Sequence, residues 1–381
     1  MTALKSKHRV RAYGIESSEN AFDWLKALEG GAVAVSAPCR VDMGGTIDIR
    51  TFSYPLQHLG PCTVNIALDL RTTVRITPYT RSRVKVSSRG FHSADFRADR
   101  APFRHPLGLM FATAAFFHAH GVHIQIESDS PPRSALGGSS AAAVALVRAF
   151  MLIRQRDGRA APVDSRSVAL VAQAIEESVA GVPCGYQDQL AAVFGGVNAW
   201  HWLAPPRKQV FRREALVPRS GLRRLEPHLL VAYVGVPHES SDINGRWVQQ
   251  FVFGKYRTDW ADVVACARQF ADLLRRREYS AAAAVMNREM DIRRRMTPEV
   301  LDRLGGNLTA AARGQSCSAR ITGAGGGGCL WAIGESDAVA SLKPLWLQIL
   351  AERKEARLLE VKVADQGLRV EDGDRAQRTE D

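Results

Sequence analysis

The sequence predicts a protein of two domains, each built from both helices and strands. The chain has 381 residues, about twice the size of a typical domain. Hydrophobic residues make up 46% and charged residues 24%, which is typical of a folded globular chain rather than a disordered one. Residues 204–227 are rich in proline and arginine and separate two patterned stretches, so we place the domain junction there.

The expected elements follow from hydrophobic periodicity and turn signals. Residues 63–77 alternate apolar and polar side chains and predict a strand, whereas residues 167–180 predict a helix with Gly181 as its C-cap. The other elements expected before the junction are a short helix at 21–28, strands at 32–36 and 122–127, and helices at 106–120 and 139–156. After the junction we expect strands at 229–234, 318–322, 329–333 and 356–363, and helices at 259–277, 280–290, 299–312 and 338–352. The predicted domains are residues 30–204 and 226–364, followed by a predicted disordered tail at 365–381, which lacks apolar periodicity.

Charge and composition narrow the classes of partner. The net charge of +12 favours anions such as nucleotides, phosphorylated metabolites or nucleic acid, although a generally arginine-rich composition is a better explanation of it than a nucleic-acid role. The basic residues are dispersed and aromatic residues are only 7%, so we expect no nucleic-acid partner. No apolar run approaches the roughly 20 residues of a membrane helix, no apolar signal core follows the basic N-terminus, and the six cysteines form no C-x-x-C pair. We therefore expect a cytoplasmic protein with reduced thiols and no membrane partner.

The strongest chemical signal is the segment PPRSALGGSSAAA at residues 131–143. Its glycines allow backbone N–H groups to approach an anion, and the Ala-rich helix that follows adds unpaired donors and a partial positive charge. The paired serines suit a helix cap or a divalent cation. The lysine of a Walker P-loop is missing. An ordinary capped, buried helix is the alternative.

A second glycine-rich segment, RITGAGGGGC at residues 320–329, matches G-x-G-x-x-G. A dinucleotide site needs a helix after the glycines, and a strand is expected here instead. The segment predicts a turn packed against a ligand or another loop, with a plain glycine-rich hairpin as the alternative.

Two weaker segments carry acids and an arginine. Glu176 and Glu177 lie near a helix end, and Asp188 stands at the start of the next helix, so these carboxylates can converge on a metal–phosphate centre or simply be solvated. Residues 37–48, APCRVDMGGTID, are expected to form a loop after a strand, which suits the rim of a polar ligand site or is an ordinary loop.

Taken together and in their order along the chain, the four segments resemble the GHMP kinase superfamily over residues 33–335. Its P-x-R/K, P-x-x-x-G-L-x-S-S-A and T-G-A-G-G-G-G motifs all have counterparts here. The Q-D-Q-x-A-A setting of Asp188 is most similar to the sugar kinase branch, which includes galactokinases, L-fucose kinases and heptose 7-phosphate kinases.

The resemblance implies an α+β fold with two domains: an N-terminal ATP-binding domain with a left-handed β-α-β unit and a ferredoxin-like C-terminal domain. It implies a kinase that uses ATP and Mg²⁺ to phosphorylate a hydroxyl of a small-molecule sugar or sugar phosphate, as a monomer or homodimer. The alternatives are a non-catalytic sugar or ATP sensor and a mevalonate-pathway kinase or decarboxylase relative.

The resemblance also implies roles for individual residues. Asp188 stands where the family has its catalytic Asp, and Arg40 matches the basic residue beside it. Ser140 and Glu177, eleven residues before Asp188, match the metal ligands. The implied ATP-binding residues are Pro132, Leu136, Gly137, Gly138, Ser139, Ser140 and Ala141. The implied acceptor-side residues are Asp48, Gly45, Gly185, Thr322, Gly323, Ala324, Gly325 and Gly326.

The sequence departs from the family in two places. The Glu-His pair of galactokinases is replaced by Gly-Gly-Thr-Ile before Asp48, and the segment from Arg40 is one residue shorter, which counts against galactose as the acceptor. Ala135 replaces the usual Gly before Leu136, so we expect an ordinary backbone angle there. For residues 237–244, followed by Arg246, two roles are expected: they border the acceptor pocket, or they form the capped start of a helix.

Overall fold

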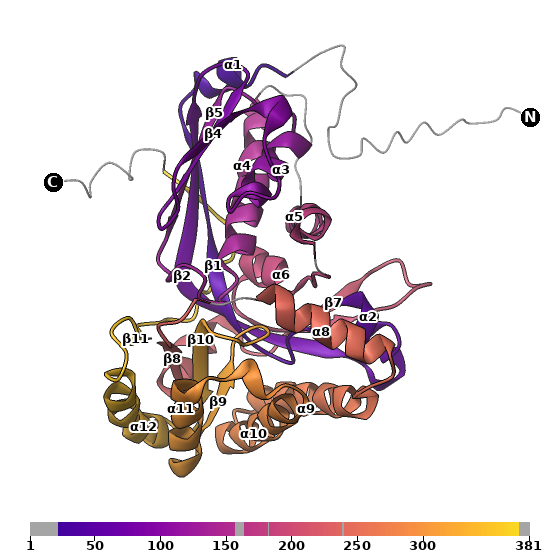
Figure 1. Ribbon diagram of the computed structural model, residues 1–381, viewed down its shortest axis with the longest axis vertical. Helices are drawn as coiled ribbons and strands as arrows, with labels where there is room; N and C mark the ends of the chain where they lie inside the picture. Colours follow the sequence, from indigo (N-terminus) through magenta and orange to yellow (C-terminus); the bar gives the residue numbers. More distant parts are fainter. Residues whose placement is uncertain (1–21, 157–163, 182, 238–239, 373–381) are drawn as a thin grey trace, which may run out of the picture.

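The computed structural model describes residues 22–156, 164–181, 183–237 and 240–372. Within these ranges the chain forms two sheets, one of eight strands and one of four, each covered by helices (Figure 1). The division into two domains of mixed α and β structure agrees with the prediction.

The first sheet is built around two long antiparallel strands, β1 (Val33–Met43) and β2 (Cys62–Pro78). The strand order is β12-β1-β2-β5-β3-β4, and β6 pairs with the first part of β2 and with β7. The other strands of this sheet are β3 (Arg83–Ser88), β4 (Ala94–Arg97), β5 (Val122–Ser128), β6 (Val197–Trp202), β7 (Phe211–Ala215) and β12 (Arg369–Glu371).

The helices of this domain lie on one face of the sheet (Figure 1). Helix α4 (Gly138–Arg156) packs against β1 and β2, and its alanines permit this close approach because Ala141, Ala143 and Ala145 are fully buried. Around it lie α3 (Gly108–Phe116), α5 (Ser165–Ala180) and α6 (Gln187–Phe194), with the short α1 (Trp24–Leu28) and α2 (Arg50–Ser53) at the ends of the sheet. Gly181 caps α5 in the left-handed conformation, as predicted.

The second sheet has the antiparallel order β11-β8-β10-β9. Its strands are β8 (Leu229–Tyr233), β9 (Ser318–Ile321), β10 (Cys329–Ile333) and β11 (Arg357–Leu359). Numbered 1 to 4 along the chain, the strands β8, β9, β10 and β11 lie in the order 4-1-3-2. Helices connect β8 to β9 and β10 to β11, which is the ferredoxin-like arrangement. The helices are α8 (Ser240–Val252), α9 (Arg257–Arg276), α10 (Tyr279–Met296), α11 (Arg303–Gly314) and α12 (Ser336–Leu350).

Strand β1 is twice as long as the sequence predicts, and all of its residues are buried. Residues 39–43, expected to be a loop, continue the strand after a bulge between Pro38 and Cys39 and pair with β2. The charged Arg40 and Asp42 concealed the strand, because polar residues are rarely buried unless they are paired. Their partners come from residues far away in the sequence.

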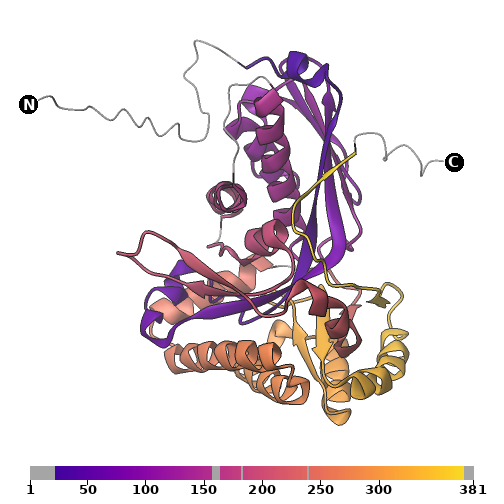
Figure 2. The same cartoon turned by 180° about the vertical axis from the view of Figure 1, so that it is seen from behind.

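The predicted disordered tail is wrong for residues 365–372. Strand β12 pairs antiparallel with β1, and Figure 2 shows the C-terminal segment returning from the second domain along the first sheet. The Arg71 guanidinium donates to the carbonyl oxygens of Gln366 and Gly367, at 3.3 and 2.7 Å. Backbone pairing and this side chain hold the segment, so no apolar periodicity is needed. Residues 373–381 lie outside the described residues.

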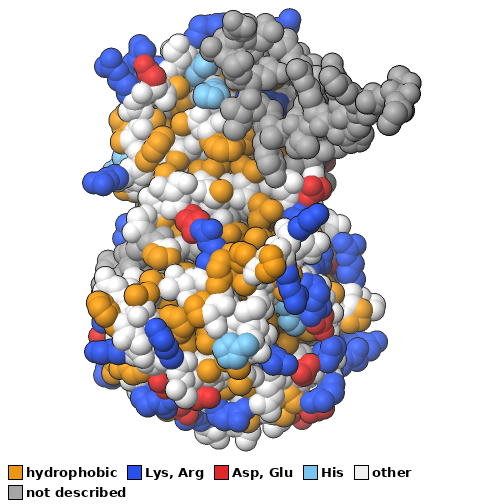
Figure 3. All heavy atoms as spheres, turned by 90° about the vertical axis from the view of Figure 1, so that its right-hand side faces the viewer, with side chains coloured by type: hydrophobic (Ala, Val, Ile, Leu, Met, Phe, Trp, Pro, Cys, Tyr) orange, Lys and Arg blue, Asp and Glu red, His pale blue; other side chains and the backbone are white. Residues whose placement is uncertain are grey.

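Several further elements had weak sequence signals. Strands β3, β4, β6 and β7 were not predicted, and β7 extends the first sheet beyond residue 204 into the expected junction. Helix α8, which begins at Ser240, was expected only as one of two alternatives for residues 237–244. No helix in the described parts of the chain is long and apolar enough to cross a membrane. The face drawn in Figure 3 carries basic side chains interspersed with acidic and apolar ones.

Candidate active site

A cavity of about 580 Å³ lies between the loop before α4 (residues 131–137), the start of α6 and the glycine-rich turn between β9 and β10 in the second domain. The predicted site residues that line it are Arg40, Asp48, Pro132, Gly137, Gly138, Ser139, Ser140, Gly185, Asp188, Gly323 and Ala324. The predicted residues that do not line it are Gly45, Leu136, Ala141, Glu177, Thr322, Gly325 and Gly326. The two glycine-rich segments therefore meet at one cavity, although about 190 residues separate them in the sequence.

The loop before α4 is held from both domains. Gly137 has a φ of 77°, and Gly138 begins the helix, one residue before the predicted start at Ser139. A Cβ at Gly328, in the turn between β9 and β10, would lie 2.6 Å from the carbonyl oxygen of Ser134 and 2.8 Å from the Cβ of Ala135. Glycine is required there because the backbone of the second domain touches the loop directly.

The expected ordinary backbone angle at Ala135 is wrong, because its φ is 60°, in the left-handed region. The carbonyl oxygen of Ala135 accepts a hydrogen bond of 2.7 Å from Nη1 of Arg40, and the turn at Gly328 packs on its other side. These tertiary contacts impose a conformation that an alanine adopts at a cost of about 1–2 kcal/mol.

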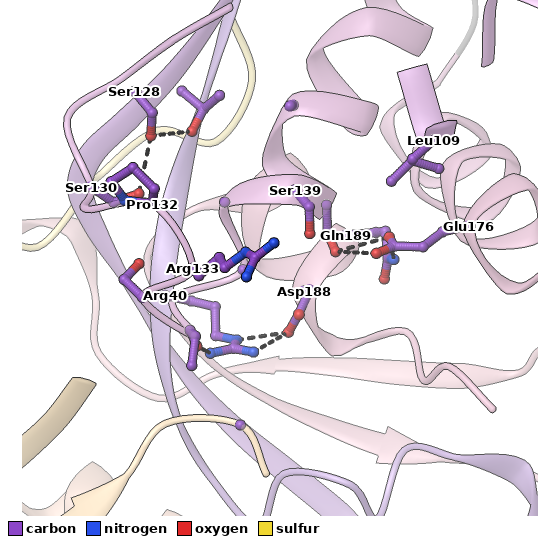
Figure 4. Close-up of a pocket in the computed structure, with 18 of the residues that line it drawn as sticks. Arg40, Leu109, Ser128, Ser130, Pro132, Arg133, Ser139, Glu176, Asp188 and Gln189 are labelled. Carbon is purple, nitrogen blue, oxygen red and sulfur yellow. Dashed lines mark hydrogen bonds and ion pairs between the residues drawn. The ribbon is translucent and has the colours of Figure 1, made fainter. Parts of the chain in front are cut away.

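Arg40 and Asp188 form the ion pair that the resemblance implies (Figure 4). Both Nε and Nη2 of Arg40 lie 2.7 Å from Oδ1 of Asp188. Burial disfavours the charged guanidinium, but the charges of Asp188 and Asp42 outweigh burial, so the pKa of Arg40 is raised. The Asp188 side chain is 25% exposed and faces the cavity, where it can accept a hydrogen bond from a ligand.

Glu176, rather than the predicted metal ligand Glu177, joins Ser140 at the start of α4 (Figure 4). Its carboxylate accepts hydrogen bonds from Oγ of Ser140, at 2.8 and 3.1 Å, and from Nε2 of Gln189, at 2.7 Å. Glu177 points elsewhere and pairs with Arg50 at 2.6 Å. Burial, reinforced by the charge of Asp188, raises the pKa of Glu176 to about 7.

Asp48 is a second buried carboxylate at the cavity. Its Oδ2 accepts a hydrogen bond of 3.0 Å from the backbone N–H of Gln187. A Cβ at Gly185 would lie 1.7 Å from the same oxygen, so glycine at 185 lets the chain pass over the acid. Burial raises the pKa of Asp48 to about 6, and the charge of Asp188 adds to the effect.

The acceptor-side segment after β8 contributes one side chain to the cavity. Asn244 lines it and lies 3.5 Å from Oγ1 of Thr46, another lining residue. Arg246 pairs with Glu299 at 2.8 Å. Residues 238 and 239 lie outside the described residues.

Behind the cavity, a chain of buried ion pairs crosses between the domains, and sequence reasoning missed it. Asp42 lies 3.3 Å from Arg40 and 2.9 Å from Arg320, and Arg320 also donates to Glu289 at 3.0 and 3.1 Å. Glu289 in turn accepts from Arg293 at 2.5 Å. Signs therefore alternate from Asp188 in the cavity to Arg293 in α10. Nothing in the local sequence marks these residues as buried partners.

The chain of ion pairs also fixes the predicted acceptor-side glycines. The Arg293 guanidinium donates to the carbonyl oxygen of Gly45 at 2.6 Å, and the backbone N–H of Gly323 donates to Oδ1 of Asp42 at 2.7 Å. A Cβ at Gly45 would lie 2.2 Å from Oδ2 of Asp42. Gly45 therefore supports the cavity from behind rather than lining it.

Comparison with known proteins finds a family model and curated relatives that match part of this chain. The model of the GHMP kinases N terminal domain matches residues 107–196. A galactokinase of Roseiflexus sp. (strain RS-1) is 31% identical over 173 residues, which are 43% of this chain and 40% of that protein. A D-glycero-alpha-D-manno-heptose 7-phosphate kinase of Campylobacter jejuni is 30% identical over 116 residues, 30% of this chain and 32% of that protein. The match thus spans two fifths or less of the length of these relatives.

Among solved structures, the Lactococcus lactis galactokinase complexed with galactose has a TM-score of 0.68 and 16% identity. It covers 90% of this chain and 97% of its own, so the likeness extends over both domains of the fold. The likeness in structure shows the fold, and the family model matches residues 107–196 within its first domain.

Proposed function

We propose that this chain is an ATP-dependent kinase that transfers the γ-phosphoryl group to a hydroxyl of a sugar or a sugar phosphate. The observation that carries the proposal is the Arg40–Asp188 ion pair, which faces a glycine-rich loop at the start of α4 across one cavity. A helix start with free backbone N–H groups suits the nucleotide phosphates, and the ion pair suits the reacting hydroxyl.

In this reaction Asp188 accepts a hydrogen bond from the acceptor hydroxyl and orients its oxygen towards the γ-phosphorus. Asp188 also takes the hydroxyl proton as the new bond to phosphorus forms. Arg40 holds Asp188 in position before the acceptor binds, because its guanidinium is already fixed by Asp188, Asp42 and the carbonyl oxygen of Ala135. Positioning and charge neutralisation are the main needs of phosphoryl transfer.

The residues around Ser140 fit a magnesium ion. Mg²⁺ is usually bound by one or two carboxylates together with phosphate oxygens and water, and Ser140, Glu176 and Asp188 provide such a set. Within the described residues, Oε1 of Gln189 is buried beside this set without a hydrogen-bond partner, so one further oxygen is available as a ligand. When bound there, Mg²⁺ neutralises charge on the nucleotide phosphates.

Asp48 supplies acceptor recognition in this proposal. An ionised carboxylate accepts hydrogen bonds from two neighbouring hydroxyl groups, which are a common feature of sugars. Its burial within a loop fixed by Gln187 and Gly185 gives it one orientation. The relatives named as galactokinase and heptose 7-phosphate kinase favour the sugar class, while the changed segment before Asp48 leaves the particular sugar to experiment.

The test is ATP turnover with Mg²⁺ against fucose, galactose, arabinose, glucuronate and heptose 7-phosphate, with mevalonate as a control acceptor. We expect ADP release that depends on one of the sugars and that disappears in Asp188→Asn, while ATP binding, measured by calorimetry, is retained. Turnover with mevalonate alone would assign the chain to the mevalonate-pathway branch. ATP binding without any acceptor-dependent turnover would favour the sensor alternative.

A further inference from the structure

Arg133, in the loop before α4, is one of three arginines lining the cavity, with Arg89 and Arg357, that the proposed mechanism does not use. It is exposed, lines the cavity, and has its guanidinium directed into the space near Ser139 and Asp188 (Figure 4). Within the described parts of the chain its side chain forms no ion pair or hydrogen bond. Arg40, by contrast, is held by both Asp188 and Asp42.

The backbone at Arg133 is strained. Its φ is 52°, in the left-handed region that disfavours residues with a Cβ, and within the described residues no side-chain hydrogen bond or ion pair of Arg133 offsets this cost. The loop is nevertheless fixed from two sides. A Cβ at Gly90, after β3, would lie 2.9 Å from Cγ of Pro132, and Gly328 touches Ser134. Backbone strain that is maintained by the surrounding packing is typical of residues at active sites and ligand-binding sites.

The charges at the cavity leave a place for this cation. Asp48, Glu176 and Asp188 line it, and the charge of Arg40 is already shared between Asp188 and Asp42. A nucleotide triphosphate adds further negative charge close to these acids. A guanidinium without a carboxylate partner, on the loop that forms the phosphate site, counters that charge and presents several donors to phosphate oxygens.

We propose that Arg133 is a further catalytic residue, whose guanidinium binds the oxygens of the transferred phosphoryl group; this inference rests on the proposed kinase function. In the transfer, the bond between the γ-phosphorus and the bridging oxygen of ADP breaks and a bond to the acceptor oxygen forms. The acceptor proton goes to Asp188, and Arg133 keeps its protons throughout. Its hydrogen bonds strengthen as charge shifts onto the phosphoryl oxygens.

The first experiment compares Arg133→Met and Arg133→Lys with wild type and with Arg207→Met, which removes the same charge from an exposed turn. We expect Arg133→Met to lower kcat about 100-fold and Arg133→Lys to restore part of the loss. By calorimetry with Mg²⁺, Arg133→Met should weaken ATP more than ADP, because ADP lacks the group that Arg133 contacts. Arg207→Met should behave as wild type.

Three outcomes would overturn the assignment: a kcat within twofold of wild type, an equal loss of ATP and ADP affinity, or a rise in KM confined to a phosphorylated acceptor. The last would assign Arg133 to the acceptor phosphate instead. If wild type shows no acceptor-dependent turnover but Arg133→Met still weakens ATP selectively, the proposed function fails and the phosphate contact stands.

The strain gives an independent readout. Arg133→Gly relieves the left-handed angle, so we expect a melting temperature at least as high as that of wild type together with the same loss of kcat. Added guanidinium ion should restore part of the turnover of this variant but not of Asp188→Asn. A destabilised Arg133→Gly variant, or one without rescue, would show that the arginine serves the fold rather than the phosphoryl group.

Discussion

Asp42 offers a direct test of the buried charges that connect the two domains. Its side chain is fully buried, 3.3 Å from Arg40 and 2.9 Å from Arg320. Replacement by Asn keeps the shape but removes the negative charge between the two guanidinium groups, which then retain only Asp188 and Glu289 as acidic partners. The amide nitrogen also places a donor where Asp42 accepts hydrogen bonds from Arg320 and from the backbone N–H of Gly323.

The expected cost of Asp42→Asn is about 3–5 kcal/mol in the free energy of unfolding, the range for removing one partner of a buried ion pair. The matched control is Asp272→Asn, whose side chain is 58% exposed and pairs with Arg275 at 2.7 Å. A surface pair of this kind contributes about 0–1 kcal/mol. Urea denaturation of wild type and both variants gives the free energies of unfolding, which are calculated from the transition midpoint and from the dependence of the free energy on urea concentration.

A second measurement separates charge from packing. The double variant Asp42→Asn with Arg320→Met removes an acid and a base together, so we expect it to lose less stability than the sum of the two single variants. Additive losses, or a loss for Asp42→Asn no larger than that of Asp272→Asn, would refute the reasoning that these charges depend on one another.

Three further predictions concern the cavity. Glu176→Gln should raise the Mg²⁺ concentration needed for half-maximal turnover at least tenfold, whereas Glu177→Gln should not; the reverse result would restore Glu177 as the metal ligand. If ionised Asp48 binds the acceptor, kcat/KM for the acceptor should fall as the pH drops through about 6, and this limb should be absent from the residual activity of Asp48→Asn. Because the pKa of Asp48 in the folded protein lies above its ordinary value of 3.8, ionisation of Asp48 should lower the free energy of unfolding as the pH rises from 3.8 through about 6. Denaturation of wild type and Asp48→Asn at pH 4 and pH 7 checks this. Ala135→Gly should leave kcat unchanged and raise the free energy of unfolding by up to about 1 kcal/mol, since glycine accepts the φ of 60° at a smaller cost; a loss in urea denaturation would contradict this.

The sequence could predict those parts of the site whose signals are local. The start of α4 at Gly138 follows from paired glycines before an Ala-rich run, and the C-cap at Gly181 from a glycine after a periodic segment. The choice between Glu176 and Glu177 is different in kind. Successive helical residues point about 100° apart, and only the packing of α5 against α4 decides which carboxylate reaches Ser140.

The parts that escaped prediction depend on contacts between distant segments. Hydrophobic patterns do not identify a buried strand that contains Arg40 and Asp42, because its charges are satisfied by residues of α6, β9 and a loop. The positive φ of Ala135 likewise comes from the glycine turn at 328 and from Arg40 rather than from its own sequence. Both cases lie at the candidate site, where tertiary contacts override local preference.

Arg40 and Arg133 represent two ways of placing a positive charge in the same cavity. Arg40 is fixed before any ligand arrives, since the acids on either side and the carbonyl oxygen of Ala135 occupy its donors. Its orientation therefore needs no reorganisation during the reaction, and the buried ion pairs behind it supply that rigidity. Arg133 has a strained backbone and no side-chain partner among the described residues, so its donors are available to a phosphate. A site that must bind an anion and also hold a carboxylate in position needs both kinds of arginine, because a single guanidinium cannot be saturated by acids and still receive the phosphoryl group.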